Sequence, residues 1–198
     1  MARRSDHTRE ELKQLILDRA LEHLQTEPIQ GLSLRQLAKK VGYVPSSLLN
    51  VFGSYNYCLL AVSGIGLDRL TNYCQRAIES STQAETKIAA MALAYYQFAT
   101  EQTNLWRLML ELKLAEDEEI PANHLNKITH LFGLLEVSLK QLKPGLDETE
   151  YTDASRTLWA SVQGITQMSL DDKLFSQPLL GEKLITDLVR HYLTSWQK

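Results

Sequence analysis

Side chains able to support catalysis or metal binding are few in this chain and poorly spaced for it. Cys58 and Cys74 lie in a segment expected to be one helix, which puts their Cα atoms about 24 Å apart and excludes a disulfide. His124 and His130 have a poor spacing for a shared metal ion, and we expect them at the surface or at a helix end. The G-x-S-x-G, Walker and H-E-x-x-H motifs are absent. We therefore expect no enzyme activity, no metal site and no cofactor.

The polar side chains best suited to recognition lie in one short segment. Ser46, Ser47 and Asn50 are uncharged hydrogen-bonding residues, and asparagine can pair bidentately with adenine in the major groove of DNA. Tyr43 and Tyr55 flank them and could offer hydroxyl groups to phosphates. The segment predicts a surface that reads base edges through uncharged side chains.

Charge is distributed unevenly along the chain. Residues 1–52 carry eight Lys and Arg against six Asp and Glu, whereas the remaining residues carry thirteen against eighteen. A mildly basic N-terminal part favours contact with phosphate at that end. No Lys or Arg occurs between Val41 and Asp68. Contacts with phosphate would therefore come from flanking residues, namely Arg3, Arg4, Arg9, Arg35, Lys39 and Lys40.

The elements that position these residues are expected to be helices. Apolar residues recur at helical spacing and strand patterns are lacking, so the spacing predicts an all-α fold. Ser33 and Gln36 form a capping box, Gly42 ends that helix, and Pro45 suits the first turn of the next. Two short helices joined by a glycine turn are typical of a helix-turn-helix. About nine helices are expected, at about 8–27, 34–40, 45–51, 55–80, 84–101, 104–114, 121–142, 148–170 and 179–196.

The sequence resembles the TetR/AcrR family of transcription factors. SLRQLAKKVGY at 33–43 matches the family's helix-turn-helix segment, and Leu48 and Phe52 stand where its recognition helix is anchored. YYQFATEQTNLWRLML at 95–110 and LWASVQG at 158–164 are similar to the subgroup with a C-terminal Trp-x-x-x-His-Gly motif, with Gln163 in place of the histidine. The resemblance implies a helix-turn-helix DNA-binding domain at 1–53, joined by a long helix to a helical ligand-binding and dimerisation domain within 54–198.

The contact surface departs from the family pattern at three positions. The family's tyrosine and histidine in the recognition helix are Leu49 and Val51 here, and its phosphate-binding lysine is Tyr55. Leu49 and Val51 either pack inside the domain or contact thymine methyl groups. The DNA-binding residues expected from this comparison are Arg3, Arg4, Arg35, Tyr43, Pro45, Ser46, Ser47, Asn50 and Tyr55.

Large apolar side chains are spread over the helices of the C-terminal part. Helices that converge can enclose a pocket for a small hydrophobic ligand, although the same side chains can simply fill the core. Gln163 and Tyr96 would supply orienting polar groups. The expected ligand-binding residues are Tyr96, Trp106, Met109, Phe132, Trp159, Gln163 and Met168.

A broad apolar stripe on the last helix predicts a buried face. By the resemblance, the last two helices of each subunit form a four-helix dimer interface, which would place two recognition helices roughly 34 Å apart. The expected interface residues are Leu158, Val162, Leu184, Ile185, Leu188, Tyr192 and Trp196.

The function expected from these patterns is a cytoplasmic, ligand-responsive DNA-binding regulator. It would be a repressor, released from a palindromic operator by a small hydrophobic effector through movement of the helix that carries Gly64 and Gly66. Close packing without motion is an equally good explanation of those glycines. The alternative function is a ligand- or protein-binding module with the same fold that no longer binds DNA specifically.

Overall fold

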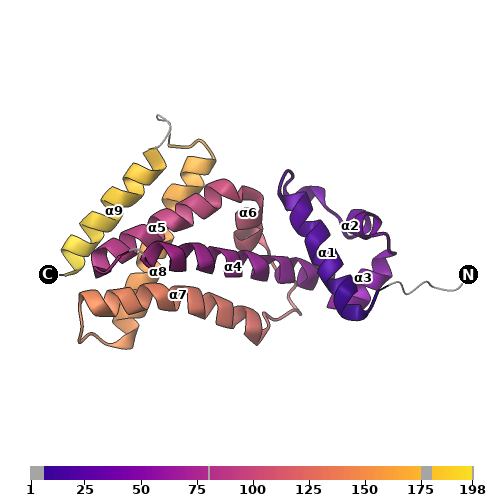
Figure 1. The fold of residues 1–198 in the computed structure, drawn as a ribbon, viewed down its shortest axis with the longest axis horizontal. Coiled ribbons are helices and arrows are strands. Elements are labelled where there is room, and N and C mark those ends of the chain that lie inside the picture. The colour runs from indigo at the N-terminus through magenta and orange to yellow at the C-terminus, as the bar shows by residue number, and fades with distance from the viewer. Residues whose placement is uncertain (1–6, 80, 175–179, 198) are drawn as a thin grey trace, which may run out of the picture. The chain divides into compact units, whose positions relative to one another are not determined.

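The computed structural model describes residues 7–79, 81–174 and 180–197, and within these the chain forms nine α-helices, one short 3-10 helix and no strand. The all-α fold expected from the sequence is confirmed. Figure 1 shows the helices in chain order, from indigo to yellow. They are α1 (Arg9–Leu24), α2 (Leu34–Val41), α3 (Pro45–Phe52), α4 (Tyr55–Glu79), α5 (Ala84–Glu101), α6 (Thr103–Glu111), α7 (Ala122–Leu142), α8 (Glu148–Leu170) and α9 (Leu180–Trp196); the 3-10 helix is Ile29–Gly31.

The helix ends follow local capping chemistry. Thr8, Ser33 and Asp147 each cap a helix, and each pairs reciprocally with a glutamate or glutamine three residues on. Gly42 ends α2 with a φ of 84°, a left-handed conformation that glycine adopts without steric cost. The helix expected at 104–114 ends earlier, because Leu112 is extended.

The chain divides into two compact units. One consists of Met1–Gly66 and Gln102–Pro121, and the other of Leu67–Glu101 and Ala122–Lys198. The start of α4 and the whole of α6 thus belong with α1, α2 and α3, whereas the sequence placed a domain boundary after residue 53. The division after residue 53 into a DNA-binding domain and a ligand-binding and dimerisation domain stays a prediction.

In the N-terminal unit, α1 packs against α2, α3 and α6. The contact is apolar: Ile16, Leu37 and Leu48 are almost completely buried. The side chain of Asn104 donates a hydrogen bond of 3.0 Å to the carbonyl of Leu24 and so fixes α6 to the end of α1. These contacts hold α3 in place through its inner face.

In the C-terminal unit, α5 packs against α7, α8 and α9, and α8 packs against both α7 and α9. Figure 1 shows these helices side by side. Apolar burial of this kind is the main force that holds a helical bundle together. The buried core cluster consists of Ile88, Leu139, Tyr151, Ala154, Leu158, Val189 and Leu193.

Two glycines allow close approach inside their units. A Cβ atom on Gly66 would lie 2.5 Å from Sδ of Met109, and one on Gly181 would lie 2.6 Å from the hydroxyl oxygen of Tyr96. Both distances are far below van der Waals contact. Close packing against Met109 therefore explains a glycine at position 66 of α4. Close packing without motion was one of the two explanations that the sequence left open.

Candidate DNA interface and ligand cavity

The helix-turn-helix is built by backbone bonds around one glycine. The amides of Gly42 and Tyr43 both donate to the carbonyl of Ala38, at 3.0 Å each, and this closes the end of α2. Val44 then precedes α3 without a side-chain cap, and Pro45 occupies the first turn of α3. The turn, the capping box of α2 and the position of Pro45 agree with the sequence prediction.

The outer face of α3 is polar but uncharged, with an apolar part. Leu48 is buried and anchors the helix. Ser46, Leu49 and Asn50 are exposed, whereas Pro45, Ser47 and Val51 are half-buried. Leu49 and Asn50 lie three and four residues after Ser46, so the three side chains share one face of the helix.

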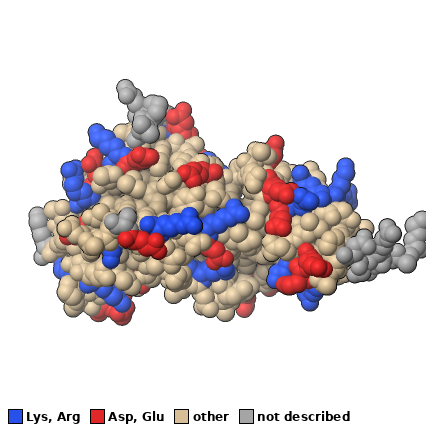
Figure 2. Space-filling model, viewed as in Figure 1, with Lys and Arg blue, Asp and Glu red and all other residues tan. Residues whose placement is uncertain are grey.

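The basic residues near α3 have different surroundings. Arg35, Lys39 and Lys40 on α2 are exposed. Arg9 instead donates to the carbonyls of Val51, at 3.2 Å, and of Asn50, at 3.5 Å, which is a favourable position for a cation at a helix C-terminus. Arg3 and Arg4 lie outside the described residues. Figure 2 shows basic and acidic side chains interspersed over the face in view.

The two tyrosines expected to contact phosphate both make bonds within the chain. The hydroxyl of Tyr43 bonds to Nδ1 of His7, at 2.8 Å, in an exposed position. The hydroxyl of Tyr55 donates to the carbonyl of Leu32, a buried residue, and burial raises the pKa of Tyr55. The structure therefore gives the Tyr55 hydroxyl a bond inside the unit, and its contact with phosphate stays a prediction.

A carboxylate that sequence reasoning missed lies at the start of α4. Glu118, in the segment between α6 and α7, accepts hydrogen bonds from Ser54, from the side chain of Asn56 at 2.8 Å and from the amide of Ala115 at 3.0 Å. These bonds lower the pKa of Glu118, that from Ser54 most strongly. Ser54 also caps α4 by accepting a hydrogen bond of 3.1 Å from the amide of Tyr57. Glu118 thus ties its segment to the helix that follows α3.

An apolar cavity of about 60 Å³ lies inside the C-terminal unit. Its walls come from α4, α5, α7, α8 and α9, and its lining contains no charged side chain. The hydroxyl of Tyr95 donates to Oε1 of Gln163, which gives one wall a hydrogen-bonded polar pair. The lining residues are Cys74, Ile88, Met91, Ala92, Tyr95, Leu131, Phe132, Leu135, Leu158, Trp159, Val162 and Val189.

Two of the seven residues expected to bind ligand line this cavity, namely Phe132 and Trp159, whose rings meet edge to face. Gln163 adjoins it through Tyr95. Met168 is exposed.

The other three expected ligand residues lie elsewhere. Trp106 is completely buried and Met109 packs beside Gly66, both in the N-terminal unit. Tyr96 bonds to Ser169 at 2.9 Å. Their sizes suggested ligand contact, but each of them fills space elsewhere.

The sequence held a signal that identifies Tyr95 rather than Tyr96. Ile88, Met91 and Tyr95 lie three and four residues apart, so they share a face of α5, and all three line the cavity. Tyr96 is rotated by about 100° from that face. Helical periodicity could thus have separated these adjacent tyrosines.

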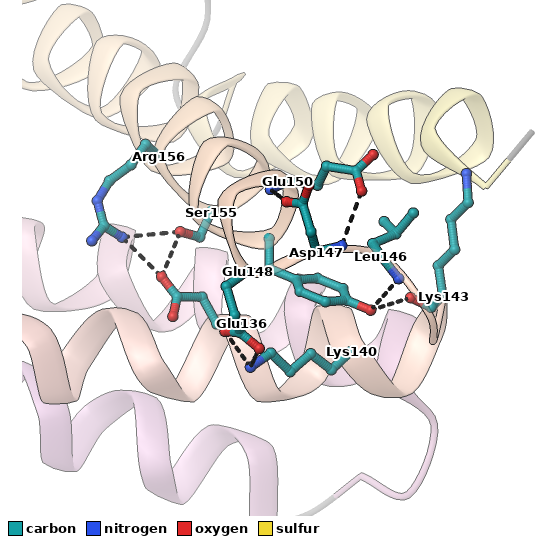
Figure 3. Close-up of polar contacts among 10 residues, drawn as sticks. Glu136, Lys140, Lys143, Leu146, Asp147, Glu148, Glu150, Ser155 and Arg156 are labelled. Atoms are coloured by element: carbon teal, nitrogen blue, oxygen red, sulfur yellow. Dashed lines mark hydrogen bonds and ion pairs between the residues drawn. The ribbon is translucent and has the colours of Figure 1, made fainter.

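A polar network braces the wall formed by α7 and α8 from outside. Glu136 on α7 accepts bonds from Ser155 at 3.1 Å and from Arg156 at 3.3 Å, both on α8 (Figure 3). The guanidinium carbon of Arg156 lies 3.4 Å from the ring centroid of Phe132, one of the cavity's aromatic side chains. A cation over an aromatic face is attracted to it. Arg156 therefore connects the network to the cavity wall.

The thiols and histidines give no sign of chemistry. Cys58 and Cys74 are unpaired and buried, and burial raises the pKa of both thiols to about 12, so they remain protonated. His124 is buried in the first turn of α7, at a helix end, and His130 is exposed at the surface, the two kinds of position expected from the sequence. Among the described residues, no group of three or more His, Cys, Asp or Glu side chains is arranged to hold a metal ion.

The residues expected to form a dimer interface divide into three sets. Leu158, Val162 and Ile185 are buried inside the chain and so are not available to a second copy. Tyr192 and Trp196 pack against the chain's own core cluster. Leu184 and Leu188 are half-buried. The outer face of α8 instead exposes Ala160, Gly164 and Met168.

A match to a protein-family model identifies the family of this chain. Residues 88–192, just over half of the chain, match the family described as tetracyclin repressor-like, C-terminal domain. The chain belongs to the TetR family. The all-α fold and the helix-turn-helix are those of a TetR-family transcriptional regulator. A search of curated proteins finds no match.

Solved structures share this TetR fold over nearly the whole chain. A protein of unknown function from Rhodococcus sp. RHA1 is 23% identical, with a TM-score of 0.77, and 98% of each chain is covered. The TetR-family transcriptional regulator PfmR from Thermus thermophilus is 18% identical, with a TM-score of 0.60, over 90% of this chain and 97% of PfmR. A TetR transcriptional regulator from Rhodococcus sp. RHA1 is 14% identical, with a TM-score of 0.67, over 94% and 98%.

None of the described helices is by itself both long enough and apolar enough to cross a bilayer; α3 and α4 reach that length and composition only as a pair bent by 64°.

Proposed function

We propose that this protein is a regulator that binds a palindromic operator in the cytoplasm as a homodimer and is released by a small hydrophobic effector. One observation carries the proposal: the glycine turn and the buried Leu48 fix α3 so that Ser46 and Asn50 point outward. A helix held in this way is the part of a helix-turn-helix that enters the major groove. Arg35, Lys39 and Lys40 on α2 supply contacts with phosphates.

The apolar cavity supports response to an effector. Its described lining has no charge, and Tyr95 in that lining bonds to Gln163 beside it, so the cavity suits a neutral, largely hydrophobic molecule with a single hydrogen-bonding group. A cavity of about 60 Å³ is smaller than a drug-sized ligand, so binding must move its walls. We propose that the side chains of Phe132 and Trp159 move when the effector binds.

The subgroup with a Trp-x-x-x-His-Gly motif is part of the same proposal. Trp159 lines the cavity, and Gly164 stands where the motif has glycine. Gln163 takes the place of the histidine and accepts the hydrogen bond from Tyr95. The replacement thus keeps a hydrogen-bonding group beside the cavity.

Two connections along the chain would carry the response to α3. Cys74 of α4 lines the cavity, and the same helix begins directly after α3. Leu131 and Phe132 of α7 line it too, and the segment before α7 holds Glu118 against the start of α4. An effector that displaces α7 or α4 would therefore alter the restraint on α4 beside the recognition helix. A hundredfold preference of the effector for the released state would supply about 2.7 kcal/mol.

Dimerisation would use the outward side of α8 and α9. Gly164 and Ala160 on α8 are small and exposed, Met168 on the same helix is an exposed apolar residue, and Leu184 and Leu188 on α9 are half-buried. Two copies paired through this face would form an isologous four-helix interface. The two copies of α3 would then meet half-sites about 34 Å apart.

The alternative is a module of the same fold that binds a ligand or a protein but no specific DNA. It is favoured by the lack of any Lys or Arg on α3 and by the internal bond of Tyr55.

Footprinting of the intergenic DNA upstream of the protein's own gene separates the two functions. We expect a protected palindrome at low salt, lost in the variants Asn50→Ala and Ser46→Ala. Asn123→Ala, which changes an exposed asparagine on α7, is the matched control and should keep the footprint. A folded dimer that protects no sequence at low salt would favour the alternative.

Effector binding is tested with N-phenyl-1-naphthylamine, a neutral hydrophobic dye that fluoresces in apolar surroundings. Ala92→Phe fills the cavity and should abolish the fluorescence increase, whereas Ala122→Phe, at an exposed position on α7, should not. Equal fluorescence from the two variants would mean that the dye, and with it the proposed effector class, does not use this cavity.

A further inference from the structure

The recognition helix exposes apolar side chains where its partner would lie. Leu49 is 36% exposed and shares the outer face with Ser46 and Asn50, and Val44, directly before the helix, is 54% exposed. Apolar surface on the reading face of such a helix is stabilised only if the partner offers apolar surface in return. We propose that α3 selects A·T base pairs, with Leu49 and Val44 packing on thymine C5-methyl groups and Asn50 bonding to adenine; this rests on the proposed binding of DNA.

The chemistry of the major groove supports thymine as the partner of these side chains. The thymine methyl is the apolar group that a base pair presents there. Asn50, four residues from Ser46 on the same face, can donate to N7 and accept from N6 of an adenine. Adjacent apolar and amide side chains therefore match adjacent thymine and adenine edges.

The absence of charge on α3 argues against readout of G·C pairs. The commonest specific contact to guanine is a bidentate Arg or Lys, and cytosine is read by Asp or Glu. None of these residues occurs between Pro45 and Phe52. Arg9, which reaches α3 from α1, is directed to the carbonyls of Asn50 and Val51 at its C-terminal end. Base selection through α3 thus falls to hydrogen bonds and methyl contacts.

Packing within the chain leaves part of the Leu49 side chain exposed. Leu48 already anchors α3 in the core of the unit and is 1% exposed. Val51 is half-buried, so of the two apolar replacements in this helix Leu49 is the more exposed, at 36%. The exposed part of the Leu49 side chain can therefore meet a ligand while the contacts that hold α3 stay in place.

The test begins with selection of duplexes from a random pool by the purified full-length protein. Each thymine of the selected site is then replaced by deoxyuridine, which removes only the methyl group. Loss of one buried methyl costs about 0.8 kcal/mol, so affinity should fall about fourfold at each contacted thymine. In Leu49→Ala the same replacement should have no further effect at the thymine that Leu49 contacts. Leu110→Ala, at a leucine that is 37% exposed on α6, is the matched control and should respond like the unchanged protein.

The possible results separate the inferred selection of A·T pairs from the proposed binding of DNA. A half-site rich in A·T pairs, with a deoxyuridine effect that vanishes in Leu49→Ala, establishes the inference. A selected site that is rich in G·C pairs, or that binds equally well with deoxyuridine throughout, overturns it while DNA binding stands. No enrichment of any duplex at low salt overturns the proposed function itself. The deoxyuridine arm alters only the DNA, so it does not depend on how well a variant folds.

Discussion

At the scale of single residues, Tyr55 shows how a side chain next to the recognition helix serves the fold. Its hydroxyl donates to the carbonyl of Leu32, which is 2% exposed and lies in the turn before α2. The bond thus joins the start of α4 to the segment that leads into the helix-turn-helix. Removal of the hydroxyl leaves a buried carbonyl without this partner.

Tyr55→Phe should lower the free energy of unfolding by about 1 kcal/mol, which is typical for a lost hydrogen bond to a buried group. Urea unfolding of the purified protein measures it. Tyr43→Phe removes a hydroxyl whose bond to His7 is exposed, and it should change stability much less. Operator affinity should be the same for Tyr55→Phe and the unchanged protein. A stable Tyr55→Phe variant with weakened affinity would return Tyr55 to the role of a phosphate contact.

His124 makes stability depend on pH. Burial lowers its pKa below the ordinary value of 6.5, the positive charge of Lys127 lowers it further, and Asp68 opposes both effects. The unfolded chain therefore takes up a proton more readily than the folded one as the pH falls through about 6.5. His124 thus stabilises the fold above that pH, and this contribution is lost as the pH falls towards the lowered pKa. Urea unfolding at about pH 7.5 and about pH 5.5 should show the lower stability at the acidic pH.

The variant His124→Gln should reduce this difference between the two pH values. His130→Gln, at an exposed histidine on the same helix, should leave it as it is. An undiminished difference in His124→Gln would show that other groups produce the pH dependence.

At the scale of elements, local chemistry made most helix ends predictable. The capping box of Ser33 and Gln36 and the turn at Gly42 depend on neighbours within a few residues, and both were identified from the sequence. Glu118 was not, because it meets Ser54 across 64 residues of chain. The early end of α6 has the same origin: Leu112 leaves the helix, and the segment that follows reaches the start of α4 through Glu118.

Residues of the candidate sites were less predictable than the elements that carry them. Size and apolar character selected Trp106 and Met109 as ligand residues, yet both fill the N-terminal unit. The same criteria selected Leu158 and Ile185 as dimer contacts, although both are buried inside the chain. Hydrophobicity predicts that a side chain is buried, but the partner that buries it depends on packing between distant helices.

Two glycines within helices should respond to alanine in opposite ways. At Gly181, in the first turn of α9, a Cβ would meet the ring of Tyr96 at 2.7 Å, and overpacking of this kind costs about 1–3 kcal/mol. At Gly133, in the middle of α7, it meets nothing within 4 Å, and alanine should stabilise the helix by up to about 1 kcal/mol. Thermal unfolding of Gly181→Ala and Gly133→Ala measures both. A Gly181→Ala variant as stable as Gly133→Ala would disprove the close approach of α9 and Tyr96.

At the scale of the whole molecule, Gly164→Arg tests the proposed dimer. A Cβ at Gly164 meets nothing within 4 Å in the chain itself, and arginine is a better helix former than glycine, so the fold should persist. A large charged side chain on the outer face of α8 would separate two copies. Sedimentation velocity at micromolar concentration should then show a monomer. Thr129→Arg, at an exposed position on α7, should remain a dimer. A dimeric Gly164→Arg variant would move the interface away from this face.

The uncharged surface of α3 also affects how the molecules of such a regulator distribute between the operator and the rest of the chromosome. Non-specific attachment to DNA depends almost entirely on cations that neutralise phosphates, and a genome offers about 10⁶–10⁹ competing sites. A reading helix without Lys or Arg, in a chain of net charge −3, adds little to that attachment. Fewer copies would be held at random sequence, so a small number of molecules per cell could keep one operator occupied.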